Sequence, residues 1–180
     1  MKQKFHKWFW VWEFEKEVQW LNAMAAKGFG LCHVGLATYW FEDIEPGEYT
    51  YYLELADNLP GSEKGKEYLD FLAECGTEYV GNYIRWTYLR RKTADGPFEL
   101  HADLDSKIAH LRRILLLLLP AGLLNLWSAY LNIHHGLLHH SDSNLITGCV
   151  GLTVLLLLLY AEIRIGTRMH KLKKERRLHE

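Results

Sequence analysis

Four histidines stand close together in one short stretch of the chain, which reads HHGLLHHSDSN over residues 134–144. Neutral imidazole is a good ligand for zinc, copper or nickel, and on a helix His135 and His139 would share one face at a spacing of four residues. The stretch therefore raises the hypothesis of a metal site formed by His134, His135, His139 and His140. Because adjacent histidines point apart, a solvated linker without a metal is the alternative interpretation.

Other reactive side chains occur in patterns that do not suggest a catalytic group. Glu13, Glu15 and Glu17 surround Lys16, which is typical of the solvated side of a helix. The three cysteines lie far apart without a C-x-x-C spacing, which favours free thiols in a reducing compartment. The sequence has no nucleophile elbow, HExxH, phosphate-loop or dinucleotide-binding motif. We therefore predict a protein that is not an enzyme and needs no cofactor.

The segment WFWVW at residues 8–12 suggests binding instead of catalysis. In an extended strand, Trp8, Trp10 and Trp12 would point to one face, and Phe9 and Val11 would point to the other. Three indoles on one open face exceed the apolar patch that a monomer normally exposes. We therefore expect another protein, a ligand, a second copy or the end of the domain itself to cover these tryptophans.

Two apolar segments change the class of the protein. Residues 114–133 and 145–161 carry no charged side chain over 20 and 17 residues. At a rise of about 1.5 Å per residue, helices of this length cross about 30 Å of hydrocarbon, or nearly so. Runs of consecutive leucines leave no polar face for water, so the alternative of two buried helices in a soluble core is disfavoured. We predict a transmembrane hairpin, in which Gly148 and Gly151 allow the helices to approach closely.

The basic residues predict the orientation of this hairpin. Residues 1–113 hold 14 Lys and Arg against 18 Asp and Glu, whereas residues 164–180 hold 7 against 2. The loop 134–144 contains neither Lys nor Arg. Basic residues stay on the cytoplasmic side of a membrane, so we expect both termini in the cytoplasm and the histidine-rich loop outside. The basic tail would then contact anionic lipid headgroups.

The first half of the chain predicts a folded α+β domain. Its periodicity, turn residues and helix caps give strands and helices in the order β-α-β-β-α-β, which is the ferredoxin-like pattern with one four-stranded antiparallel sheet. The expected strands are residues 3–12, 29–42, 49–55 and 77–91, and the expected helices are residues 13–27 and 63–75, with a turn at 45–48 and Ser62 as an N-cap.

The tryptophans would lie on a central strand of this sheet. Phe9 and Val11 have the smaller volumes that suit the layer beneath the helices, which leaves the tryptophans on the open face. The opposite parity, with the tryptophans in the helix-side core, is the alternative. RNA-binding modules share this element order, but the RNP signature is missing and the domain is net acidic, so we expect no nucleic acid.

Several blocks of the sequence resemble the DUF2812 family over residues 2–119. They are KWFWVWEFEKEVQWLNAMAAKG, PGEYTYYLELADNLP, EYVGNYIRWTYLRRK, and the junction from DGPFEL to IAHLRRILLLL. The resemblance implies a bacterial membrane protein, often encoded beside PadR-type transcriptional regulators, which suggests a regulatory setting. The family is of unknown function, so the resemblance implies no catalytic or binding residues.

Together these observations predict a membrane-tethered, non-enzymatic binding or sensing module in the cell membrane. It would engage a partner protein or a small apolar ligand through Trp8, Trp10 and Trp12. The alternatives are a structural homo-oligomer that buries this face against itself, and an extracytoplasmic metal sensor that uses the histidines. The expected parts are a ferredoxin-like domain (1–92), a juxtamembrane connector (93–113), transmembrane helices (114–133 and 145–165), the loop between them (134–144) and a basic cytoplasmic tail (166–180).

Overall fold

The computed structural model describes residues 2–96, 98 and 104–179, which belong to two compact units, residues 1–102 and 103–180. The first unit is a mixed α+β domain made of two consecutive halves, in each of which the strands and the α-helix follow the order β-α-β-β. The first half contains β1 (Gln3–His6), η1 (Val11–Glu13), α1 (Phe14–Ala25), β2 (Phe29–Gly35) and β3 (Thr38–Asp43). The second half contains β4 (Tyr49–Leu55), α2 (Glu63–Glu74), β5 (Thr77–Tyr83), β6 (Trp86–Lys92) and η2 (Thr93–Asp95).

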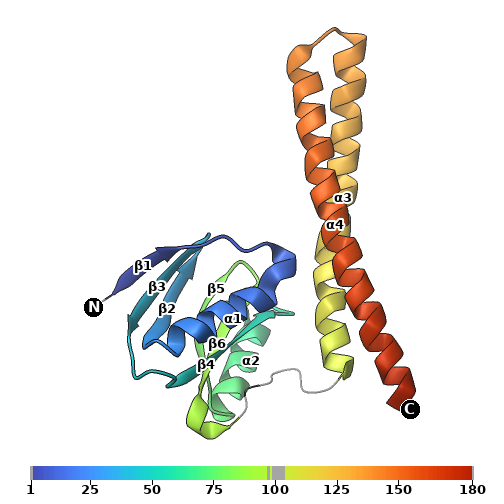
Figure 1. Cartoon of the computed structure of the whole chain (residues 1–180). Helices are drawn as coiled ribbons and strands as arrows, with labels where there is room; N and C mark the ends of the chain where they lie inside the picture. Colours follow the sequence, from blue (N-terminus) through green and yellow to red (C-terminus); the bar gives the residue numbers. More distant parts are fainter. Residues whose placement is uncertain (1, 97, 99–103, 180) are drawn as a thin grey trace. The chain divides into compact units, whose positions relative to one another are not determined.

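Each half forms its own three-stranded antiparallel sheet, in the order β1-β3-β2 in the first and β4-β6-β5 in the second (Figure 1). The predicted ferredoxin-like fold, with one four-stranded sheet, is therefore not confirmed. Two of its expected strands, residues 29–42 and 77–91, are hairpins instead. Their turns contain no glycine. Ala37 and Ile84 instead take the left-handed conformation there, with φ of 49° and 56°. Such turns leave little signal in the sequence.

The expected strand 3–12 is also wrong, since β1 ends at His6. The chain then turns into a helix start, where Glu13 N–H donates to the Trp10 carbonyl at 2.7 Å. The Glu13 carboxylate accepts from Trp10 N–H at 3.4 Å. This local capping competes with strand formation, because it satisfies backbone groups that a helix start would otherwise leave unpaired.

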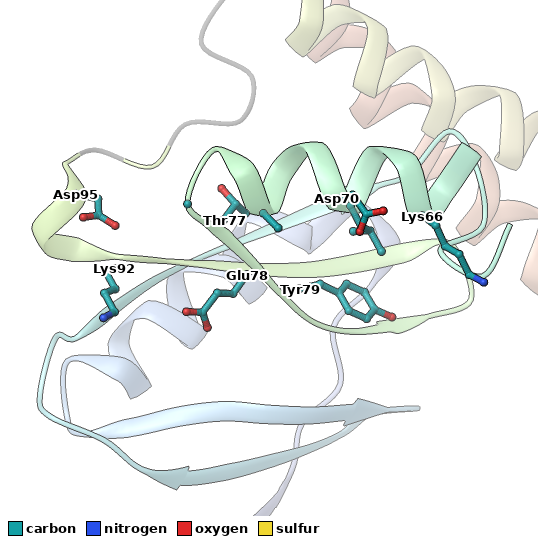
Figure 2. A pocket seen from close by; sticks show the side chains of 10 residues that line it. Lys66, Asp70, Thr77, Glu78, Tyr79, Lys92 and Asp95 are labelled. Carbon is teal, nitrogen blue, oxygen red and sulfur yellow. The ribbon is translucent and has the colours of Figure 1, made fainter. Parts of the chain in front are cut away.

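The remaining elements follow their local signals. The turn at 45–48 forms, with Gly47 at a φ of 78°, and β4 has the predicted bounds. Ser62 caps α2, because its hydroxyl accepts from Gly65 N–H at 3.1 Å. The core lies where α1 contacts β2 of the first sheet and β4 of the second, and Leu21, Phe41 and Leu89 are fully buried. A groove is lined by residues of α2, of β5, which is an edge strand of the second sheet, and of the segment that follows β6 (Figure 2).

The second unit is a helical hairpin of α3 (Leu104–Leu138) and α4 (Asp142–His179). Small residues bring the helices together: a Cβ on Gly148 would lie 2.4 Å from Ile133, and one on Gly151 would lie 3.0 Å from the Cβ of Ala129. The prediction of a close approach at these glycines is confirmed. Beyond it, Arg176 near the end of α4 pairs with Asp105 near the start of α3 at 2.6 Å.

Both helices are long and apolar enough to cross a membrane. Many of their leucines point outward from the hairpin, and Leu124 and Leu156 are 71% and 67% exposed. These leucines are therefore not buried within this unit. The helices also extend beyond the predicted spans. The loop predicted at 134–144 is mostly helical, since only residues 139–141 separate α3 from α4, and the predicted tail 166–180 continues α4 to His179. Within the predicted juxtamembrane connector (93–113), residues 97 and 99–103 lie outside the described residues.

Candidate functional site

The tryptophan cluster, Trp8, Trp10 and Trp12, forms at the start of α1 and not on a sheet. Trp8 and Trp10 stand between β1 and η1, and Trp12 belongs to η1. The rings of Trp10 and Trp12 stack with centroids 5.0 Å apart and an interplanar angle of 6°. The rings of Trp8 and Trp10 pack edge to face, with their centroids 5.6 Å apart. The three indoles predicted to act together are therefore in contact, although the strand that was expected to align them is absent.

The cluster remains largely open to solvent. Trp8 is 57% and Trp10 is 41% exposed, whereas Trp12 is half-buried. The alternative prediction, that the tryptophans form the helix-side core, is wrong for Trp8 and Trp10. Phe9 points the other way, as predicted. Its ring packs on Trp20 of α1, with the ring centroids 5.7 Å apart, and on Tyr39 of β3, with the ring centroids 6.4 Å apart. Phe9 thus anchors the segment that displays the indoles.

A buried carboxylate lies beneath this anchor. Glu17 of α1 is only 7% exposed, and its Oε1 accepts hydrogen bonds from the Tyr39 hydroxyl at 2.7 Å and the Tyr88 hydroxyl at 2.6 Å. Burial raises the pKa of Glu17 above its ordinary value of 4.5, and the hydrogen bonds from Tyr88 and Tyr39 lower it by less. The same burial raises the pKa of both tyrosines, so both remain donors at neutral pH.

The sequence interpretation missed this residue, because Glu17 was assigned to the solvated side of its helix. A signal was present, since Glu17 follows Phe14 by three residues and precedes Leu21 by four. Those positions share one helix face, and both flanking residues are buried. A carboxylate in line with two core positions indicates a buried group.

A second polar side chain of α1 reaches the other half of the domain. The Asn22 Oδ1 accepts from Tyr51 N–H at 2.7 Å, and the Asn22 Nδ2 donates to the Tyr51 carbonyl at 3.2 Å. Tyr51 lies on β4, which is an edge strand of the second sheet. The amide therefore pairs with this edge as a neighbouring strand would.

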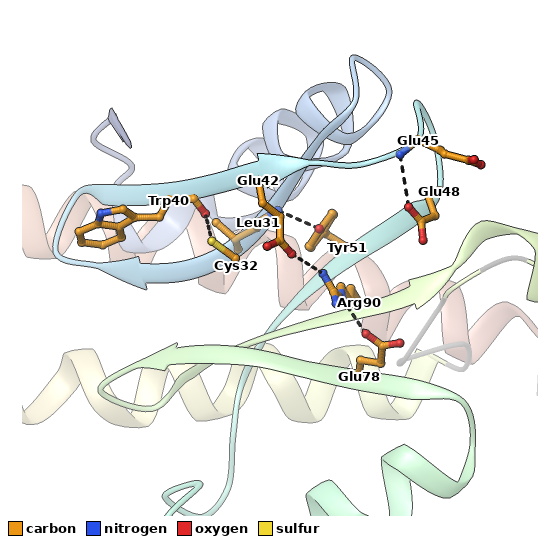
Figure 3. A network of polar contacts seen from close by, with 9 residues as sticks. All are labelled: Leu31, Cys32, Trp40, Glu42, Glu45, Glu48, Tyr51, Glu78 and Arg90. Carbon is orange, nitrogen blue, oxygen red and sulfur yellow. Dashed lines mark hydrogen bonds and ion pairs between the residues drawn. The ribbon is translucent and has the colours of Figure 1, made fainter. Parts of the chain in front are cut away.

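A polar network also crosses between the two sheets (Figure 3). Arg90 of β6 donates to Glu78 at 2.8 Å and lies 4.0 Å from Glu42 of β3. At the bulge of β2, Leu31 N–H donates to the Tyr51 hydroxyl at 2.9 Å. Together with Glu17 and Asn22, these contacts hold the two halves in one arrangement and give the tryptophan cluster a fixed support.

The four predicted metal ligands do not come together as one group. His134 and His135 lie on α3, His139 follows its end, and His140 takes the left-handed conformation with a φ of 50°. The rings of His135 and His139 are 4.3 Å apart, and His135 Nδ1 lies 3.1 Å from Asn144 Nδ2. In the part of the chain that the structure describes, no three His, Cys, Asp or Glu residues are arranged to hold a metal ion.

The comparisons with known proteins give one match. The family model described as "Protein of unknown function (DUF2812)" matches residues 13–123, which is more than half of the chain. The match includes Glu17, Asn22 and both sheets except β1, and it extends into α3. It begins directly after the tryptophan cluster. No curated protein and no solved structure matches the chain.

Proposed function

The chain belongs to the DUF2812 family, and from this premise we propose that it is a membrane-tethered, non-enzymatic binding module with a regulatory role. The tryptophan cluster is its contact surface, and the α3–α4 hairpin is its anchor. One observation carries the proposal: two indoles of the cluster are 57% and 41% exposed while Phe9, between them in the sequence, is packed on Trp20 and Tyr39.

The exposed indoles support binding because they supply large contact area at a small cost in conformational entropy. Tryptophan is enriched among the residues that dominate protein interfaces, and its ring combines apolar area with one N–H donor. Ordering the cluster beforehand, through the Trp10–Trp12 stack and the Phe9 anchor, reduces the entropy lost on binding.

Stacked rings with this exposure offer a surface, whereas small-molecule sites are concave and bury most of their ligand. We therefore favour a partner protein over a small apolar ligand. A second copy of the chain is the competing occupant of the same surface, and the experiment below separates the two.

The hairpin supports the membrane anchor. Many of its leucines are exposed, such as Leu124 at 71%, and apolar helices of this length satisfy every backbone group in lipid. Residues 139–141 between the helices carry no Lys or Arg, whereas the end of α4 is strongly basic. This asymmetry favours cytoplasmic termini. Protease added outside intact cells should then leave the first unit uncut, and its digestion would contradict this topology.

The test removes the exposed indoles and leaves the half-buried Trp12 in place. The Trp8→Ala/Trp10→Ala double variant and wild type are cross-linked in native membranes, and the captured proteins are identified by mass spectrometry. Phe71→Ala is the matched control, because Phe71 is an equally exposed aromatic on α2. We expect one heterologous partner captured by wild type and Phe71→Ala and lost at least tenfold from the double variant.

Two results would contradict the proposal. Equal capture by all three proteins would show that the indoles are not the contact. Cross-links only between identical chains, lost in the double variant, would assign the surface to a homo-oligomer instead.

A further inference from the structure

Backbone hydrogen bonds hold the turn between α3 and α4 in one conformation. His139 N–H donates to the His135 carbonyl at 3.0 Å, so the last helical turn of α3 continues through His139. Ser141 N–H donates to the Gly136 carbonyl at 3.0 Å, and His140 takes the left-handed conformation with a φ of 50°. This is the pattern of a Schellman cap, which ends a helix with a left-handed residue. The cap therefore fixes His139 relative to His135.

The imidazole rings of His135 and His139 lie on the same side of this last turn. The two residues are four positions apart, which places them on one helix face, and their ring centroids are 4.3 Å apart. Both residues are exposed. The ring of His134 lies elsewhere, with its centroid 5.8 Å from that of Tyr130. No third His, Cys, Asp or Glu joins the pair within the described ranges of the chain.

The separation of the two rings indicates the geometry of a shared metal ion. With a metal–nitrogen bond of about 2.0 Å and about 1.1 Å from that nitrogen to the ring centre, each centroid would lie about 3.1 Å from the metal. Ligands at about 90° then place the centroids about 4.4 Å apart, whereas ligands at the tetrahedral angle place them about 5.1 Å apart. The separation of 4.3 Å matches the smaller angle. That angle belongs to the square-planar and tetragonal sites typical of Cu²⁺ and Ni²⁺.

Asn144, in the first turn of α4, orients the ring of His135. Its side-chain amide nitrogen lies 3.1 Å from His135 Nδ1 and 3.0 Å from Ser141 Oγ. When Nδ1 carries the ring proton, the amide turns so that its oxygen accepts from Nδ1 and from the Ser141 hydroxyl. The lone pair of His135 Nε2 then remains for a metal. An outer hydrogen bond of this kind fixes the tautomer and the orientation of most histidine ligands.

We propose that His135 and His139 bind one divalent metal ion of the square-planar or tetragonal class, of which Cu²⁺ binds tightest, and that Asn144 is a positioning residue of this site. The two imidazoles take neighbouring coordination positions, and water takes the others. The site uses two of the four histidines that the sequence suggested as one group. It lies in the second unit and does not depend on the function proposed for the tryptophan cluster.

The test titrates Cu²⁺ alone into the full chain in detergent micelles. The three cysteines are changed to serine so that thiolates do not compete for copper. Calorimetry counts the bound ions, and electron paramagnetic resonance reports the geometry and the nitrogen ligands. We expect saturable binding of one Cu²⁺ per chain in a tetragonal site with two nitrogen ligands.

Variants then assign the ligands. His135→Ala and His139→Ala should each lower the affinity for Cu²⁺ at least tenfold, and Asn144→Ala should lower it about tenfold, as the loss of an outer hydrogen bond does. His134→Ala and His140→Gly are the matched controls, since they remove the adjacent imidazoles and glycine accepts the left-handed conformation at position 140. Both controls should bind Cu²⁺ as tightly as the unsubstituted site does.

Three results would overturn the proposal. The absence of saturable binding would exclude the site, and an equal loss of affinity in either control would mean an adventitious ion only. One Cu²⁺ for every two chains would show that the ion links imidazoles of two copies and not a pair within one chain.

Discussion

The Tyr39 hydroxyl donates a 2.7 Å hydrogen bond to the Glu17 carboxylate, which joins β3 of the first half of the domain to α1. Tyr88 of β6, in the second half, donates to the same oxygen. One carboxylate on one helix thus links both sheets. Burial raises the pKa of Glu17, and the hydrogen bonds from Tyr88 and Tyr39 act in the opposite direction. A buried carboxylate held in this way is sensitive to pH.

The first prediction concerns the pH dependence of stability. Because the folded pKa of Glu17 is raised above 4.5, the folded state holds this proton more tightly than the unfolded state does. The stability contributed by Glu17 is fully present below about pH 4.5 and is lost as the pH rises through the folded pKa. The free energy of unfolding of wild type, relative to Glu17→Gln, should therefore fall from pH 4.5 upward.

Denaturant unfolding followed by tryptophan fluorescence, repeated over a pH series, measures this difference. Only the slope against pH is decisive, since the glutamine amide adds a donor that needs its own acceptor. Glu67→Gln serves as the control, because Glu67 is an exposed carboxylate on α2. A difference that rises with pH, or one that Glu67→Gln reproduces, would contradict a raised pKa at Glu17.

The second prediction concerns Asn22, whose amide makes two hydrogen bonds to the backbone of Tyr51. Asn22→Ala leaves a backbone donor and acceptor of β4 without these partners, and the expected loss is about 1–3 kcal/mol. Asn22→Asp keeps the acceptor but sets a carboxylate oxygen against the Tyr51 carbonyl, so it should also destabilise the domain. The midpoint of denaturant unfolding should fall at unchanged slope. Asn58→Ala, an exposed asparagine, should change little; a similar loss there would remove the specific role of Asn22.

Part of this architecture could be read from local sequence signals. The turn at 45–48, the cap at Ser62 and the two apolar helices depend on residues within a few positions of one another, and all of them appear in the structure. The hairpins at Ala37 and Ile84 could not be predicted in this way. Their left-handed turn residues lack the usual glycine or asparagine, and the pairing of their strands, a long-range effect, holds them there.

The candidate site also combines features that the local sequence predicts with contacts that depend on the tertiary fold. The alternation in residues 8–12 correctly separated the tryptophans from Phe9, although the segment is not a strand. Glu17 was missed because its partners, Tyr39 and Tyr88, are 22 and 71 residues away in the sequence. Charge alone favoured a solvated position, and only the tertiary fold supplies the two hydroxyl groups that make burial tolerable.

The third prediction compares Gly65, in the first turn of α2, with Gly61, which precedes this helix. Alanine normally stabilises a helix relative to glycine by about 1 kcal/mol. A Cβ on Gly65, however, would lie 2.0 Å from the Leu59 carbonyl oxygen, a backbone atom that cannot move aside alone. Gly65→Ala should therefore destabilise the first unit by about 1–3 kcal/mol, as overpacking typically does. Gly61→Ala meets nothing within 4 Å and should be neutral. Equal unfolding midpoints for the two variants would contradict the close packing of α2 on residue 59.

The last prediction concerns the contact between α3 and α4. A Cβ at position 151 would lie 3.0 Å from the Cβ of Ala129, whereas disulfides need about 3.5–4.5 Å between these atoms, so a small outward shift of the helices suffices. In a chain whose native cysteines are changed to serine, Ala129→Cys/Gly151→Cys should oxidise within one chain. Intact mass should show the loss of two hydrogens without a dimer. Leu123→Cys/Gly151→Cys is the control, because Leu123 points outward from the hairpin, and it should stay reduced. A disulfide between two chains in the first variant would mean that α3 pairs with α4 of another copy, because the same small residues would then pack across a dimer and not within one hairpin.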